Sequence, residues 1–311
     1  MRMLTFKSAR HFAEADLEPS APACPFCDSA ERHAVGRLQD DPPILLLRCA
    51  DCHAVSASRV PTPVVLRQCY AGYAQVYARY GTEHQVTHGA VARLARHIAR
   101  GAGPMPGGSR LRLLDFGGGD GSIAIALARR YVAAGAEQVD ICVVDLLGRS
   151  APTGDARIRC VACATLAEAP PGETYDLVVA SAIVEHLPQP RPDLLRLLAA
   201  VKPGGVFYAR TPYVVPLARA ARGVGLRLDL DYPAHLHDLG PAFWRCIFAR
   251  LGPAGAFERL AEGPSPVERS FRHDPLPALA ACVAKAPWYV LGDAYALIGG
   301  WEVLARKRAT S

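Results

Sequence analysis

The sequence predicts an α/β fold in which a doubly wound, mostly parallel sheet follows a small cysteine-bearing module at the N-terminus. Apolar runs alternate with helical stretches after residue 109, and a glycine-rich turn joins the first run to a helix. Alternation of this kind is typical of parallel strands that helices cover on both faces. Two Cys-x-x-Cys pairs before residue 62 predict the module.

Composition favours a cytoplasmic protein. The chain has 311 residues, of which 50% are hydrophobic, so it can bury a core without disulfides. No stretch has the apolar length of a secretory signal or a membrane span, so we expect no membrane partner. The net charge of +6 comes from arginines spread along the chain, and we therefore do not expect nucleic acid as a partner.

Residues 1–62 form the first predicted unit, a zinc ribbon. Its two Cys-x-x-Cys pairs supply four thiolates, which can surround Zn²⁺ tetrahedrally. Four protein ligands leave no open position, so we expect the metal to be structural. The predicted ligands are Cys24, Cys27, Cys49 and Cys52.

Residues 63–108 form the second predicted unit, a helical cap that ends in a linker rich in glycine and proline. Tyrosines at positions 70, 73, 77 and 80 share one helical face. They either pack against the core or form a lid, in which case Tyr73 and Tyr77 contact the substrate.

Residues 109–311 form the third predicted unit, which holds the sheet. Short apolar runs bounded by turn residues predict its strands, and longer stretches in which apolar residues recur with helical spacing predict its helices. The strands are expected at 111–116, 139–146, 175–181, 205–210, 257–260 and 301–306, and the helices at 122–134, 193–201 and 241–251.

The turn after the first of these strands reads Asp-x-Gly-x-Gly-x-Gly, with Asp115, Gly117, Gly119 and Gly121. Glycine allows positive φ and a close approach of the backbone to a ligand. The dinucleotide fingerprint would require a third glycine at position 122, where the chain has serine. A carboxylate beside the turn suits a cationic ligand better than a pyrophosphate.

An acid, Asp145, ends the second strand, where it can accept hydrogen bonds from both hydroxyls of a ribose. This position indicates an adenosine-containing ligand. Leu146 and Ser181, at the ends of the strands expected at 139–146 and 175–181, are assigned to the same site because ligands bind beyond the carboxyl ends of parallel strands.

Further segments carry a resemblance to a known family: 175–187 with its Glu-His pair, Lys-Pro-Gly-Gly at 202–205, 231–237, and the closing strand at 301–307. With the glycine turn, they resemble class I, Rossmann-like methyltransferases that use S-adenosylmethionine. The resemblance implies a seven-stranded sheet, this cofactor and methyltransferase activity.

The ribbon, the tyrosine-bearing helix and this core together resemble methyltransferases of sugar and natural-product pathways. That resemblance implies a small-molecule acceptor: a sugar, a nucleotide-linked sugar or a natural-product intermediate. Members that methylate carbon have a glutamate where this chain has Ala234, so O- or N-methylation is favoured and C-methylation is the alternative.

Acceptors that lose a proton need a base, and histidine is suited to that role near neutral pH. His235 is the first candidate, because its loop follows the strand expected at 205–210. His237 and His186 come next, each with a structural hydrogen bond as the alternative role. Asp231 is assigned to the substrate or to orienting a histidine.

Two other functions fit the motifs less well. Some rRNA methyltransferases have an N-terminal zinc element, but this chain lacks the Asn/Asp-Pro-Pro-Tyr/Phe motif typical of base N-methylation. A non-catalytic cofactor-binding module would not need the intact turn and Asp145. The insertion at 264–300 could complete a pocket or form the contact of a homodimer.

Overall fold

The computed structural model describes residues 4–6, 10–70, 88–105, 109–146, 148–170, 174–226, 228, 230–252, 255–267 and 275–309. The predicted substrate residues Tyr73 and Tyr77 lie outside these residues. Across the described ranges, no helix combines the length and the apolar character needed to cross a membrane.

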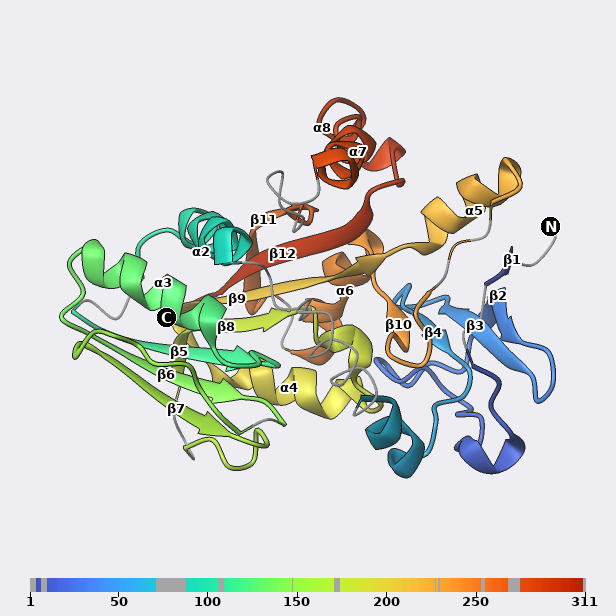
Figure 1. The fold of residues 1–311 in the computed structure, drawn as a ribbon, viewed down its shortest axis with the longest axis horizontal. Coiled ribbons are helices and arrows are strands. Elements are labelled where there is room, and N and C mark those ends of the chain that lie inside the picture. The colour runs from blue at the N-terminus through green and yellow to red at the C-terminus, as the bar shows by residue number, and fades with distance from the viewer. Residues whose placement is uncertain are drawn as a thin grey trace.

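A seven-stranded sheet forms the centre of the molecule, in the order β11-β12-β9-β8-β5-β6-β7 (Figure 1). Only β12 pairs antiparallel with its neighbours, and the other pairings are parallel. The predicted fold class is therefore confirmed. The strands are β5 (Arg110–Phe116), β6 (Gln138–Val144), β7 (Ile158–Cys163), β8 (Tyr175–Ser181), β9 (Val201–Tyr213), β11 (Phe257–Pro264) and β12 (Gly299–Lys307).

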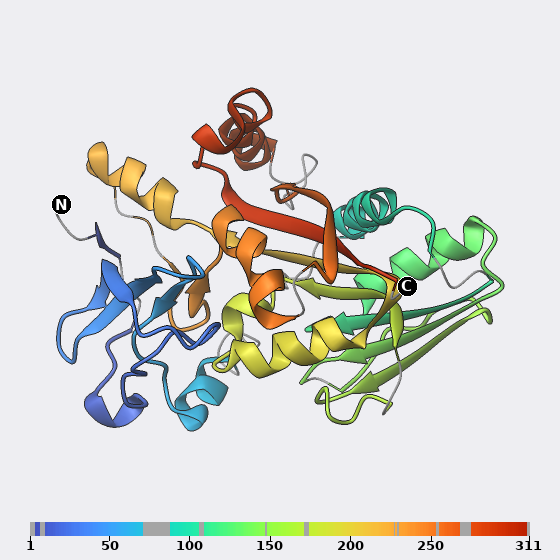
Figure 2. The same ribbon diagram turned by 180° about the vertical axis from the view of Figure 1, so that it is seen from behind.

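Helices cover both faces of this sheet, as Figures 1 and 2 show. On one face, α2 and α3 share a buried apolar cluster with the strands, and on the other face α4 and α6 share a second cluster. All seven residues of β8 are buried, because the strand lies between these two layers. The helices are α2 (His88–Ala102), α3 (Ser122–Ala133), α4 (Pro190–Ala200), α5 (Val215–Gly223), α6 (Pro241–Leu251), α7 (Pro275–Lys285) and α8 (Trp288–Leu291), and residues 63–70 are also helical.

A second, five-stranded sheet contains most of the N-terminal module, in the order β1-β2-β3-β4-β10 (Figure 1). Its last strand comes from far along the chain and pairs antiparallel with β4. The module therefore shares its sheet with the segment that follows β9. The strands are β1 (Leu4–Thr5), β2 (Arg32–Gln39), β3 (Ile44–Cys49), β4 (Val55–Ala57) and β10 (His237–Asp238).

Several elements differ in length from the prediction. β9 begins at Val201 rather than at 205, so the turn residues Lys-Pro-Gly-Gly lie within the strand. α4 begins at Pro190, three residues before the predicted start, and proline at the first helical position has a suitable φ for that start.

The insertion between β11 and β12 contains α7, α8 and the 3-10 turn η3 (Gly292–Ala294). Apolar side chains on both helices are exposed, among them Leu276, Val283 and Val290. The homodimer contact expected in this region stays a prediction.

Candidate active site and metal centre

The glycine turn between β5 and α3 has a backbone with positive φ, which glycine adopts without strain. Gly117, Gly119 and Gly121 all have positive φ, at 70°, 58° and 77°. A Cβ atom at Gly117 would lie 2.4 Å from the Ile183 side chain, and one at Gly118 would lie 2.5 Å from the Asp115 carboxyl. A side chain at Gly117 would therefore be strained and would have to displace Ile183, so glycine is strongly favoured there.

The two acids predicted beside the turn lie on adjacent strands. Asp115 is 1% exposed, and its Oδ2 has no hydrogen-bond partner among the described residues. Burial is the main cause that raises the pKa of Asp115 to about 7; a hydrogen bond from the Ala124 backbone opposes this rise, and the charges of Asp145 and Asp120 add to it. The Gly119 N–H donates to Asp145 Oδ2 at 2.9 Å, so the second acid faces the turn.

The remaining predicted cofactor residues differ in exposure. Leu146 follows β6 and is 81% exposed. Ser181 ends β8, is nearly buried, and accepts a hydrogen bond from the Arg210 guanidinium. Beyond β7, the Glu168 carboxylate accepts hydrogen bonds from the Ala164 N–H and the Thr165 hydroxyl.

A second cluster of polar side chains lies next to the turn. Two of its members lie on the 3-10 helix η2 (Val184–His186), which follows β8 and begins directly after Ile183, the residue that packs against Gly117. Glu185 is 2% exposed, and its Oε1 lies 3.9 Å from His186 Nε2. The ring centroids of His186 and His235 are 4.9 Å apart. We call Glu185, His186 and His235 the Glu-His-His cluster.

Backbone contacts hold the loop of His235 against η2. The Leu236 N–H donates to the Glu185 carbonyl at 2.8 Å, and the His235 N–H donates to the Asp231 carbonyl at 3.0 Å. His186 Nδ1 lies 2.7 Å from the Ala234 carbonyl oxygen, so Nδ1 carries a proton and donates it. The structure thus brings two of the three predicted catalytic histidines together.

His237 is not a member of this cluster and lies in the interface with the N-terminal module. It is 1% exposed, and its Nε2 donates to the Leu187 carbonyl at 2.8 Å. Nδ1 then accepts from the Ser56 hydroxyl at 2.9 Å. Burial lowers the pKa of His237 to about 4. Because both ring nitrogens of His237 make hydrogen bonds, these contacts favour a structural role for His237, which was the alternative to a catalytic one.

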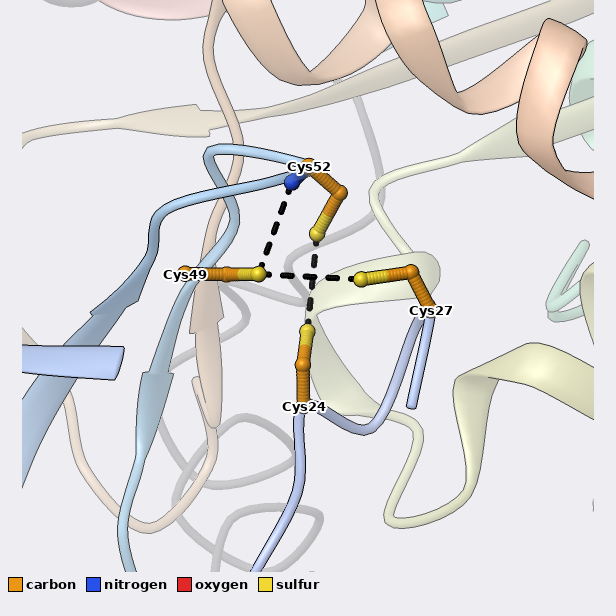
Figure 3. Close-up of side chains that lie close together, drawn as sticks. All are labelled: Cys24, Cys27, Cys49 and Cys52. Atoms are coloured by element: carbon orange, nitrogen blue, oxygen red, sulfur yellow. Dashed lines mark hydrogen bonds between the residues drawn. The ribbon is translucent and has the colours of Figure 1, made fainter. Parts of the chain in front are cut away.

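The four predicted zinc ligands come together in the N-terminal module (Figure 3). The Sγ atoms of Cys24 and Cys52 are 3.4 Å apart, and those of Cys27 and Cys49 are 3.6 Å apart. Thiolates bound at about 2.3 Å to a tetrahedral Zn²⁺ lie about 3.8 Å from one another, so the spacing fits this ion closely.

The module packs directly on the larger domain. Phe26, within the first Cys pair, has its ring centroid 4.8 Å from both the His237 ring and the Phe243 ring. Three of the cysteines belong to the same buried cluster as the sheet and α6. The cysteine site therefore contacts the segment that follows His235 through Phe26 and His237.

Sequence reasoning missed two parts of the site. Glu185 was read as part of a motif and not as a partner of the histidines, although it is adjacent to His186. Arg210, which is 4% exposed and contacts Ser181, has no sequence signal beyond its place in a strand. The predicted roles of Asp231, Tyr73 and Tyr77 stay predictions.

The order of the large sheet, the glycine turn after β5 and the acid after β6 define a Rossmann-like methyltransferase fold. A family model described as a methyltransferase domain matches residues 82–252. The chain belongs to this family.

A curated relative is the ubiquinone biosynthesis O-methyltransferase of Paramagnetospirillum magneticum, 32% identical over 149 residues. The match covers 46% of this chain and 58% of the relative, so the chain spans less than two thirds of that protein.

Among solved structures, this chain is similar to the plantazolicin methyltransferase BpumL in complex with SAH, with 12% sequence identity and a TM-score of 0.44. The match covers 79% of this chain and 91% of that chain. Coclaurine N-methyltransferase, bound to N-methylheliamine and SAH, matches with 11% identity, 70% of each chain and a TM-score of 0.42.

Proposed function

We propose that this protein is an enzyme that transfers the methyl group of S-adenosylmethionine to an oxygen or nitrogen atom of a small molecule. The position of the Glu-His-His cluster carries the proposal. Ile183 packs against Gly117, and the cluster begins two residues later, so a proton acceptor lies beside the predicted cofactor turn. The family match and the name of the curated relative support the same activity.

The residues of the turn suit S-adenosylmethionine. The buried Asp115 oxygen gains a partner if it receives the ammonium group of the cofactor, and Asp145 can accept both ribose hydroxyls. When bound, this cofactor supplies a methyl group on a sulfonium sulfur that leaves as a neutral thioether. The protein then has to position the acceptor in line with the methyl group and remove its proton.

His235 is the proposed base. It is half-buried beside His186, and hydrogen bonds from its own and the next backbone N–H hold its loop in place. It takes the proton from the acceptor as the new bond to the methyl carbon forms. A positioned base of this kind contributes about a hundredfold or more to the rate.

The four cysteines are proposed to hold a structural Zn²⁺. Their Sγ spacing fits a tetrahedral site, and no coordination position remains open for a substrate. The metal then stabilises the sheet whose last strand, β10, directly follows the loop of His235.

Calorimetry with S-adenosylmethionine and with NAD tests the cofactor, and an acceptor screen tests the reaction. The screen includes sugars, nucleotide-linked sugars and aromatic hydroxyl compounds, the last because the curated relative is named for ubiquinone biosynthesis. We expect binding of the sulfonium compound alone. Preference for NAD would contradict the proposal.

The histidine is tested with His235→Ala, with His33→Ala, an exposed histidine in β2, as the matched control. We expect turnover to fall about a hundredfold in the first variant and to stay unchanged in the second. Equal turnover of both variants would remove the assignment of His235 as the base.

A further inference from the structure

The Glu-His-His cluster brings together three metal-binding side chains outside the cysteine site. One ligand atom from each of Glu185, His186 and His235 lies within 4.8 Å of the other two. Two imidazoles and one carboxylate are a typical donor set for Zn²⁺, Fe²⁺ and related ions. We propose that this cluster binds a divalent transition-metal ion beside the acceptor.

The protonation of His186 favours metal binding. Its Nδ1 donates to the Ala234 carbonyl at 2.7 Å, so Nε2 has the lone pair and lies on the side of Glu185. Metal-binding histidines usually make this kind of hydrogen bond with the nitrogen that does not bind the metal, which sets the tautomer and the ring orientation.

Two segments distant in sequence are fixed so that their side chains converge. Glu185 and His186 come from η2, and the Leu236 N–H donates to the Glu185 carbonyl, which places His235 beside them. Bonds of about 2.1 Å to a metal would bring the three ligand atoms to about 3–4 Å from each other. Rotation of side chains that are already close suffices for this change.

The cluster differs from the cysteine site in its number of ligands. Four thiolates complete a tetrahedral shell, whereas three ligands leave at least one position open. Glu185 is buried, but both histidines are half-exposed, so the open position is on the accessible side.

The role that we assign to this open coordination position, which is to bind the methyl acceptor, rests on the proposed function. An acceptor hydroxyl that binds there becomes more acidic, loses its proton to water and keeps the electron pair for the bond to the methyl carbon. With a metal bound, His235 is a ligand, and the metal replaces it as the group that promotes loss of the proton. The acceptor class is then oxygen compounds.

Titration with Co²⁺ tests the site without cofactor or acceptor. The full chain, carrying one Zn²⁺ in the cysteine site by elemental analysis, is treated with a mild chelator and then titrated. We expect one equivalent of Co²⁺ to bind, with a visible spectrum that lacks the charge-transfer band of thiolate ligands.

Variants connect the binding to the cluster. We expect His235→Ala and Glu185→Gln to weaken Co²⁺ binding about tenfold or more, and Glu185→Asp to retain part of it. His33→Ala is the control that should bind as the wild type does. Circular dichroism checks that each variant is folded, and His235 is accessible enough for its variant to fold.

Either of two results would overturn the metal site: no equivalent of Co²⁺ beyond the cysteine site, or unchanged binding by His235→Ala. These results are distinct from failure of the proposed function. Co²⁺ binding without methylation of any acceptor would leave the metal site in place, and methylation that survives chelation without Co²⁺ binding would remove only the metal.

Discussion

The Ser56 hydroxyl donates to Nδ1 of His237, with the two atoms 2.9 Å apart, and both residues are 1% exposed. Ser56 belongs to the cysteine module, and His237 lies two residues after His235. This hydrogen bond therefore joins the module to the loop that carries the proposed base.

Ser56→Ala should lower the free energy of unfolding by about 1–3 kcal/mol, because it leaves the buried Nδ1 of His237 without a donor. Urea denaturation of the zinc-loaded protein measures the change. Ser109→Ala, an exposed serine before β5, is the control. Equal stability of the two variants would show that the hydrogen bond contributes nothing measurable.

Removal of zinc should unfold more than the N-terminal module. Structural Zn²⁺ supplies on the order of 10 kcal/mol in small zinc modules, which is comparable to the stability of a whole domain. Because three of the cysteines share a core with α6, we expect Cys49→Ser to lower the midpoint of the main transition in scanning calorimetry. Cys282→Ser, in α7, should leave it unchanged. A separate early transition with an unchanged main one would contradict this coupling.

Gly117→Ala should weaken binding of S-adenosylmethionine about tenfold or more, because strain and the contact with Ile183 move the turn. Gly223→Ala is the control, since a Cβ atom there meets nothing within 4 Å. Calorimetry measures both affinities. Tight binding by the first variant would show that the turn does not approach the ligand.

Affinity for S-adenosylmethionine should rise with pH through about 7. Burial raises the pKa of Asp115 to about 7, so the carboxylate that attracts an ammonium group forms only above that pH. Asp115→Asn should bind more weakly and lose this pH dependence. An identical pH profile in the variant would assign the titration to another group.

The stability that His97 contributes should be lost as the pH rises through its raised pKa. The hydrogen bond to Glu302 raises the pKa of His97, so the protonated ring stabilises the fold at low pH and loses its proton as the pH passes the raised pKa. Glu302 also accepts from the Tyr208 hydroxyl at 3.0 Å. His97→Gln should flatten the decline in urea midpoints, whereas His33→Gln should keep it.

Local patterns were enough to predict most of the large sheet. β5, β8 and β12 are apolar runs because helices bury them on both faces, and the glycines at 117, 119 and 121 have the positive φ that their spacing indicates. The four-cysteine cluster was also predictable from sequence, because two Cys-x-x-Cys pairs in one short segment seldom occur by chance.

Elements that depend on tertiary contacts were harder to predict. β7 lies at the edge of the sheet and is mostly half-exposed, and its continuous apolar run is only the four residues 160–163. β10 has two residues and exists only because β4 lies beside it. The cluster of Glu185 with His235 likewise depends on a backbone hydrogen bond between segments some fifty residues apart, which no local pattern reveals.

The pairing of β4 with β10 has a consequence for synthesis of the chain. The residues at this junction, Ser56 and His237, are 181 positions apart. The four cysteines leave the ribosome early, so the proposed zinc site can form before most of the chain has been synthesised. The edge of their sheet stays open until the later strand emerges, so during that interval the nascent module exposes an unpaired strand to other chains.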